Sequence, residues 1–126
     1  MITDRLAETL APIAAFFDGC RFGYEGSEGY RKSTDLYKFL RCIQELEASG
    51  WLHPQRTVFA DLGCADGRMN ILVSYFVRLS IGIEIDAEIL AEFGPRKDEL
   101  YSRLEQAELA SPPRQHCPVS GKFPDP

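Results

Sequence analysis

The sequence predicts an α/β fold, because its centre contains two apolar strands that flank a turn and a helix. The first apolar run begins at Val58 and leads into a cluster of small residues at Gly63, Ala65 and Gly67. An apolar helical segment follows, and a second apolar strand ends in Glu84. This order of strand, turn, helix, strand and terminal acid is typical of a parallel βαβ unit that binds a nucleotide cofactor.

The spacing within the turn distinguishes two kinds of cofactor. Turns that bind dinucleotides carry glycines in the pattern G-x-G-x-x-G, which lets the backbone approach a pyrophosphate. Here the small residues alternate, and Arg68 stands where the third glycine would be. Asp61 ends the first strand, and its carboxylate would repel a pyrophosphate but attract a ligand with an ammonium and a sulfonium centre. The turn therefore favours a positively charged nucleoside cofactor.

The segments VFADLGCADG and GIEID together resemble the first two motifs of the class I S-adenosylmethionine-dependent methyltransferases. The resemblance covers residues 58–90 and implies a Rossmann-like methyltransferase fold, incomplete in this chain, which would supply its N-terminal half. It also implies S-adenosylmethionine as the cofactor and methyl transfer as the activity. The cofactor-binding residues that it implies are Asp61, Gly63, Cys64, Ala65, Gly67, Glu84 and Ile85.

The resemblance implies a role for each of these residues. Asp61 would lie near the methionine end of the cofactor, and the turn backbone would lie against the cofactor. Glu84 would accept hydrogen bonds from the two ribose hydroxyls, and Ile85 would lie against the adenine face. Ala65 departs from the family, which more often has glycine there. Its methyl group narrows the site and demands an ordinary backbone conformation at this position.

Residues 1–56 predict a helical segment that precedes this unit. Apolar residues recur at helical spacing over 6–17 and again over 36–46, where Thr34 or Asp35 can cap the second helix. The segment between the two helices is rich in glycine and aromatic residues and predicts a surface loop. Its two tyrosines and an arginine could instead form a lid over the site. These residues are Tyr24, Tyr30 and Arg31.

The sequence after the second strand is first helical in pattern and then rich in proline. Residues 57–110 form the predicted first half of the cofactor-binding domain, and they end in helical segments that Gly94 and Pro95 interrupt. Residues 111–126 hold five of the eight prolines of the chain. Proline removes backbone donors and opposes sheet pairing, so these last residues predict a disordered tail.

The chain itself is expected to be inactive, although the family resemblance implies an enzyme. The adenine-side wall and the methyl-acceptor pocket of such a fold come from later strands, so the sequence names neither a catalytic residue nor an acceptor. A truncated protein, a frameshifted reading frame and a naturally short protein all fit this pattern. Two parallel strands also leave open edges, which predicts self-association through them.

Two alternative functions stay open at this point. One is an NAD(P)-binding oxidoreductase half-domain, and the other is a non-catalytic helical interaction module. The net charge of -5 without a basic stripe argues against a nucleic-acid partner. No apolar run has the length of a membrane span, and the four cysteines form no C-x-x-C pair, so we expect no metal site and a cytoplasmic location.

Overall fold

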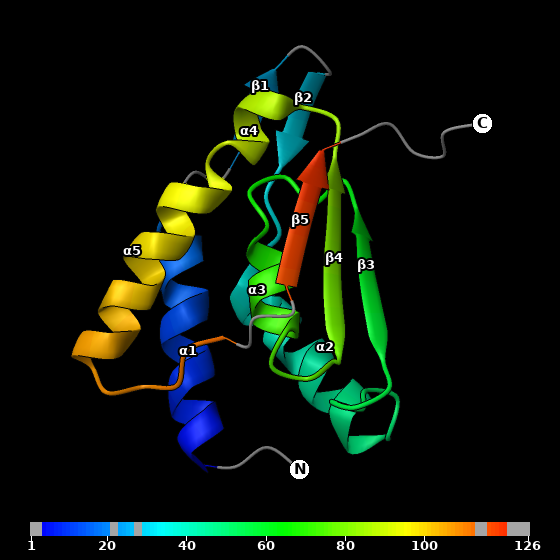
Figure 1. Cartoon of the computed structure of the whole chain (residues 1–126), viewed down its shortest axis with the longest axis vertical. Helices are drawn as coiled ribbons and strands as arrows, with labels where there is room; N and C mark the ends of the chain where they lie inside the picture. The colour runs from blue at the N-terminus through cyan, green and yellow to red at the C-terminus, as the bar shows by residue number, and fades with distance from the viewer. Residues whose placement is uncertain (1–3, 21–22, 27–28, 113–115, 121–126) are drawn as a thin grey trace.

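A computed structural model describes residues 4–20, 23–26, 29–112 and 116–120 of the chain, and the fold of these residues is mixed α/β (Figure 1). The elements in chain order are α1 (Asp4–Asp18), β1 (Gly23–Gly26), β2 (Gly29–Lys32), α2 (Leu36–Ala48), β3 (Val58–Leu62), α3 (Arg68–Val73), β4 (Leu79–Glu84), α4 (Ala87–Leu90), α5 (Phe93–Gln106) and β5 (His116–Ser120). The α/β class predicted from the sequence is confirmed at this level.

The central sheet has three parallel strands in the order β3-β4-β5. Asp61 of β3 pairs with Gly82 of β4, and Gly82 pairs in turn with Pro118 of β5. Because the strands are parallel, their carboxyl ends meet at one edge of the sheet, beside the β1–β2 hairpin and α4 (Figure 1). The strand–turn–helix–strand unit predicted from the sequence is therefore present.

One face of this sheet packs against helices. On β4 the residues Ser80, Gly82 and Glu84 are buried, and the Asn70 side chain of α3 donates a hydrogen bond to the Ser80 hydroxyl at 3.0 Å. Helices α1, α2 and α3 contribute most of the apolar core, and α1 lies to the side of the sheet, next to α5 (Figure 1). Phe17 is among the largest fully buried side chains of this core.

The opposite face of the sheet is apolar and incompletely covered. Alternate residues of a strand point to opposite faces of the sheet. The residues that alternate with the buried positions of β3 and β4 therefore form a second surface. On β3 this surface includes Val58, which is 47% exposed, and Leu62, which is 57% exposed. We call this surface the open face, and its residues are Val58, Ala60, Leu62, Leu79, Ile81 and Ile83.

The two N-terminal helices form as the apolar stripes predict. The Asp35 carboxylate caps α2 by accepting a hydrogen bond from the Lys38 N–H at 3.1 Å. Asp18, the last residue of α1, accepts a hydrogen bond from the Leu36 N–H at 2.9 Å, which joins the end of one helix to the start of the next. The segment between them contains an antiparallel hairpin, where the sequence predicted an irregular loop.

Two helices follow β4, and their boundary differs slightly from the predicted one. The interruption falls between α4 and α5, because Gly94 and Pro95 lie inside the first turn of α5. Proline is tolerated there because the first-turn N–H groups have no partner within the helix. Among the described helices, none combines the length and apolar character needed to cross a membrane.

The prediction of a disordered tail over 111–126 is wrong for β5. Residues His116–Ser120 pair with Ser80–Glu84 of β4, and Pro118 lies within the pairing. Proline is compatible with an edge strand, where one row of backbone groups needs no partner. The parts of the predicted tail at 113–115 and 121–126 lie outside the described residues.

Removing β5 is expected to destabilise the fold. A chain that ends at Ala110 would leave β4 as an edge with unpaired backbone groups, whereas a chain that ends at Ser120 keeps the pairing. A loss of even about 1 kcal/mol lowers the melting temperature by roughly 4 °C in a domain of this size. Thermal unfolding followed by circular dichroism measures the difference, and equal melting temperatures for the two truncated chains would contradict a stabilising role for β5.

Candidate functional site

The turn between β3 and α3 uses three left-handed backbone positions. The φ angles are 94° at Gly63, 52° at Ala65 and 80° at Gly67. Glycine adopts this conformation without steric cost, but an alanine in it costs roughly 1–2 kcal/mol. The expectation of an ordinary backbone conformation at Ala65 is therefore wrong, and the surrounding structure must hold this residue in place.

Backbone hydrogen bonds tie this turn to the end of β4. The N–H groups of Gly63 and Cys64 donate to the Ile83 carbonyl oxygen at 2.7 and 2.9 Å. The Ala65 N–H donates to Oε1 of Glu84 at 2.8 Å, which stabilises the strained position. Glu84 thus connects the two motifs that the sequence analysis paired.

The Glu84 carboxylate is fully buried and bridges two segments. Its second oxygen, Oε2, accepts a hydrogen bond from the Asp86 N–H at 2.8 Å, at the start of α4. The Asp86 side chain in turn caps α4 by accepting a hydrogen bond from the Glu88 N–H. A buried carboxylate with two backbone donors fixes the turn, the end of β4 and the first turn of α4 relative to one another.

A cavity of about 120 Å³ opens beside the turn and brings four of the predicted site residues together. These four are Asp61, Gly63, Cys64 and Ala65. Gly67, Glu84 and Ile85 are not part of its lining, and Ile85 is 46% exposed. The cavity is smaller than the ~300–1,000 Å³ of typical small-molecule pockets, so it could enclose only part of a ligand of that size.

Sequence reasoning missed part of this lining. The segment Lys32–Thr34, which links the hairpin to α2, borders the same cavity. The lid predicted from Tyr24, Tyr30 and Arg31 lies just before it in the chain, and Tyr30 is 67% exposed. Tyr30 does not line the cavity, to which the hairpin contributes Lys32, the last residue of β2.

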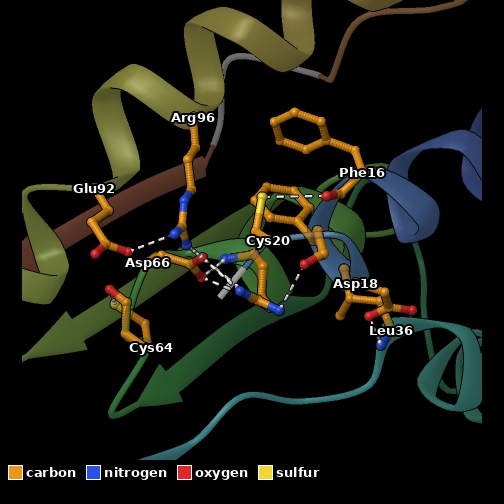
Figure 2. Close-up of polar contacts among 11 residues, drawn as sticks. Phe16, Asp18, Cys20, Leu36, Cys64, Asp66, Glu92 and Arg96 are labelled. Atoms are coloured by element: carbon orange, nitrogen blue, oxygen red, sulfur yellow. Dashed lines mark hydrogen bonds and ion pairs between the residues drawn. The ribbon is translucent and has the colours of Figure 1, made fainter. Parts of the chain in front are cut away.

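A buried ionic cluster around Asp66 is the second feature that sequence reasoning missed. Asp66 and Arg68 are 2% and 4% exposed, and the Arg68 Nε and Nη2 atoms donate to the Asp66 carboxylate at 3.0 and 2.9 Å. Arg96 of α5 reaches the same carboxylate, as Figure 2 shows. The sequence near the turn indicates this cluster only by an acid two residues before an arginine. The third member, Arg96, is 30 positions away from Asp66 in the chain.

Two opposing effects set the pKa of Asp66. Burial alone would raise the pKa of this carboxyl, but the hydrogen bond from Arg68 and the positive charges of Arg68 and Arg96 outweigh burial. The net pKa therefore lies below its ordinary value, and the group stays ionised at neutral pH. The cluster therefore contributes an ion pair, Asp66 with Arg68, to the wall of the cavity.

Cys64 is a packing residue of this turn. Burial raises the pKa of its thiol to about 12, and the carboxylates of Asp61 and Glu84 act in the same direction. Because the thiolate is the nucleophilic form, a raised pKa favours the unreactive thiol at neutral pH.

Within the described part of the chain, no group of three or more metal-ligating side chains comes together. No protein-family model, curated protein or solved structure matches this chain.

Proposed function

We propose that this chain is the cofactor-binding part of an S-adenosylmethionine-dependent methyltransferase with a Rossmann-like arrangement. The observation that carries the proposal is the link between Ala65 and Glu84, which joins the left-handed turn after β3 to the acid that ends β4. Open α/β sheets bind their ligands at this position, outside the carboxyl ends of the strands. The order β3-β4-β5 also agrees with one half of a doubly wound sheet.

The hydrogen bonding of the turn favours this cofactor over a dinucleotide. A pyrophosphate site needs backbone N–H groups that point at the ligand. The N–H groups of Gly63, Cys64 and Ala65 instead donate to Ile83 and Glu84. The Asp61 carboxylate in the cavity wall would also disfavour a phosphate, whereas the charge of Asp66 is balanced by Arg68 and Arg96.

In the proposed complex, Asp61 would face the ammonium group of the methionine end. Glu84 would receive the ribose hydroxyls, since an ionised carboxylate accepts several hydrogen bonds and binds a pair of donors well. Because Glu84 is fully buried, the ribose reaches it only after the segment that covers it opens. Cofactor binding is thus coupled to a local rearrangement at the ends of the strands.

The cofactor would supply an activated methyl group, and the residues of this chain would hold it and exclude water from one side. None of the described residues is assigned a catalytic role, and the acceptor is not specified by the site. The inactivity of the isolated chain and its cytoplasmic location stay predictions. Methyl transfer is proposed for the protein in which this half-site is completed.

Cofactor binding is expected to be weak and selective in this chain. We expect a Kd of ~1 mM for S-adenosylmethionine, about -4 kcal/mol, because the residues that the structure describes would form only one wall of the proposed site. Titrations followed by nuclear magnetic resonance would compare S-adenosylmethionine with NAD and NADP. Preference for either dinucleotide would contradict the proposal.

The variant Asp61→Asn tests the charged contact within this experiment. Removing one charge from a pair separated by about 4 Å in a solvated site costs roughly 1 kcal/mol, so the affinity should fall about fivefold. Asp98→Asn removes the same charge from an exposed position on α5 and is the matched control. Equal affinities for the two variants would mean that Asp61 does not contact the ammonium group.

A further inference from the structure

We infer that Arg96 of α5 is a positioning residue for the Gly63–Gly67 turn, so that docking of α5 regulates ligand affinity at the cavity. This inference rests on the proposed function only for the identity of the ligand. The Arg96 guanidinium lies between two carboxylates, because it contacts Asp66 of the turn and Glu92 at the start of α5 (Figure 2). The distance from its Nη2 atom to Oε2 of Glu92 is 2.9 Å.

Asp66 is the point at which three elements meet. Its carboxylate accepts from Arg68, the first residue of α3, and Arg68 Nη1 donates to the Phe17 carbonyl oxygen at the end of α1 at 3.1 Å. The Arg68 guanidinium also lies 5.6 Å from the centre of the Phe17 ring. These contacts fix one side of the turn against α1 and α3.

Arg96 completes this arrangement from the other side. Its side chain is 17% exposed, so its contact with the buried Asp66 is largely shielded from solvent and from salt. Asp66 directly follows Ala65, whose left-handed conformation depends on the hydrogen bond to Glu84. A shift of Asp66 toward Arg68 would therefore move the Ala65 backbone, which lines the cavity.

The position of α5 is otherwise determined by apolar contacts, including that of Phe93 in its first turn. Leu100 and Leu104 are buried in the core, whereas the start of the helix holds the turn through Arg96. A shift of α5 would thus move the Arg96 guanidinium, and with it Asp66 and the turn that lines the cavity. We therefore expect the position of α5 to change the affinity for the ligand, by a factor within the range typical of coupled sites.

The test compares Arg96→Ala with Arg96→Lys and with the control Arg103→Ala. Arg103 lies on the same helix and pairs with Glu99, and both side chains are more than half exposed. We expect Arg96→Ala to weaken S-adenosylmethionine binding by about fivefold, the lower limit of typical coupling. Arg96→Lys should restore part of the affinity because it keeps the charge, and Arg103→Ala should bind as the parent chain does.

The amide resonances of Gly63 and Ala65 without ligand give a second readout. Arg96→Ala should shift them and Arg103→Ala should not. Unchanged resonances and unchanged affinity in Arg96→Ala would overturn the positioning role. Loss of affinity in Arg96→Ala without any rescue by lysine, together with a general loss of amide dispersion, would also overturn it, in favour of unfolding. If the parent chain fails to bind S-adenosylmethionine, the proposed function fails, and the amide shifts still decide the role of Arg96.

Discussion

Replacing Asp66 with alanine is expected to lower the free energy of unfolding by about 3–5 kcal/mol, the usual cost of removing one partner from a buried ionic group. The substitution leaves the buried guanidinium of Arg68 without its carboxylate and removes the contact of Arg96. The Phe17 carbonyl oxygen would still accept a hydrogen bond from Arg68 Nη1, but it carries no full negative charge to balance the guanidinium. Urea unfolding followed by fluorescence of Trp51 or by circular dichroism measures the change.

Glu99→Ala is the matched control for this prediction. Glu99 also pairs with an arginine, but the pair is exposed on α5, and such pairs contribute only about 0.3–0.5 kcal/mol. A loss in Asp66→Ala no larger than that in Glu99→Ala would mean that the ionic cluster is not buried in solution.

The same carboxylate predicts a pH dependence. The pKa of Asp66 is lower in the folded chain than in the unfolded chain, so the unfolded state binds more protons as the solution becomes acidic. The stability from this group is therefore complete above its ordinary pKa of 3.8 and is lost as the pH falls below that value. Asp66→Asn should remove this part of the acid dependence, whereas Asp98→Asn should leave it in place.

Replacing Gly82 with alanine is expected to be the second most damaging change. A Cβ atom at this position would lie 2.4 Å from Oδ1 of Asn70 and 2.7 Å from Cβ of Cys64. Both distances are shorter than real contacts, and the Asn70 side chain is fully buried, so it has little freedom to move. Overpacking of this kind costs about 1–3 kcal/mol, and valine at the same position should cost more.

Gly94→Ala provides the control for this substitution. No atom lies within 4 Å of a Cβ atom built at Gly94, and the position is in the first turn of α5. Alanine is a better helix former than glycine, so this change should be neutral or stabilising by up to about 1 kcal/mol. Equal melting temperatures for Gly82→Ala and Gly94→Ala would contradict the close packing of α3 and the turn on β4.

The central unit could be predicted because its signals are local. Strand β3, the turn and β4 follow one another within 27 residues, and the turn requires glycine where the backbone is left-handed. The helices α1 and α2 were equally visible, because a helix that buries one face repeats its apolar residues every three or four positions. The juxtaposition of the turn with Glu84 followed from the parallel order of the two strands.

Features that depend on distant contacts could not be predicted in this way. β5 contains a proline and has a weak strand pattern, and its pairing comes from the unpaired edge that β4 offers. The contact of Arg96 with Asp66 joins positions 30 residues apart, and charge patterns on a helix surface usually indicate solvent exposure. Ala65 was misjudged because its conformation is imposed by the Glu84 carboxylate.

The open face of the sheet has a consequence for any measurement on this chain. Parallel sheets are normally sandwiched between two layers of helices, and here Val58 and Leu62 remain about half exposed. Each 100 Å² of this surface that a second molecule removes from water would add about 2.5 kcal/mol in favour of association. Association linked to folding makes the melting temperature rise with protein concentration. The stability measured for this chain should therefore depend on protein concentration as well as on the fold.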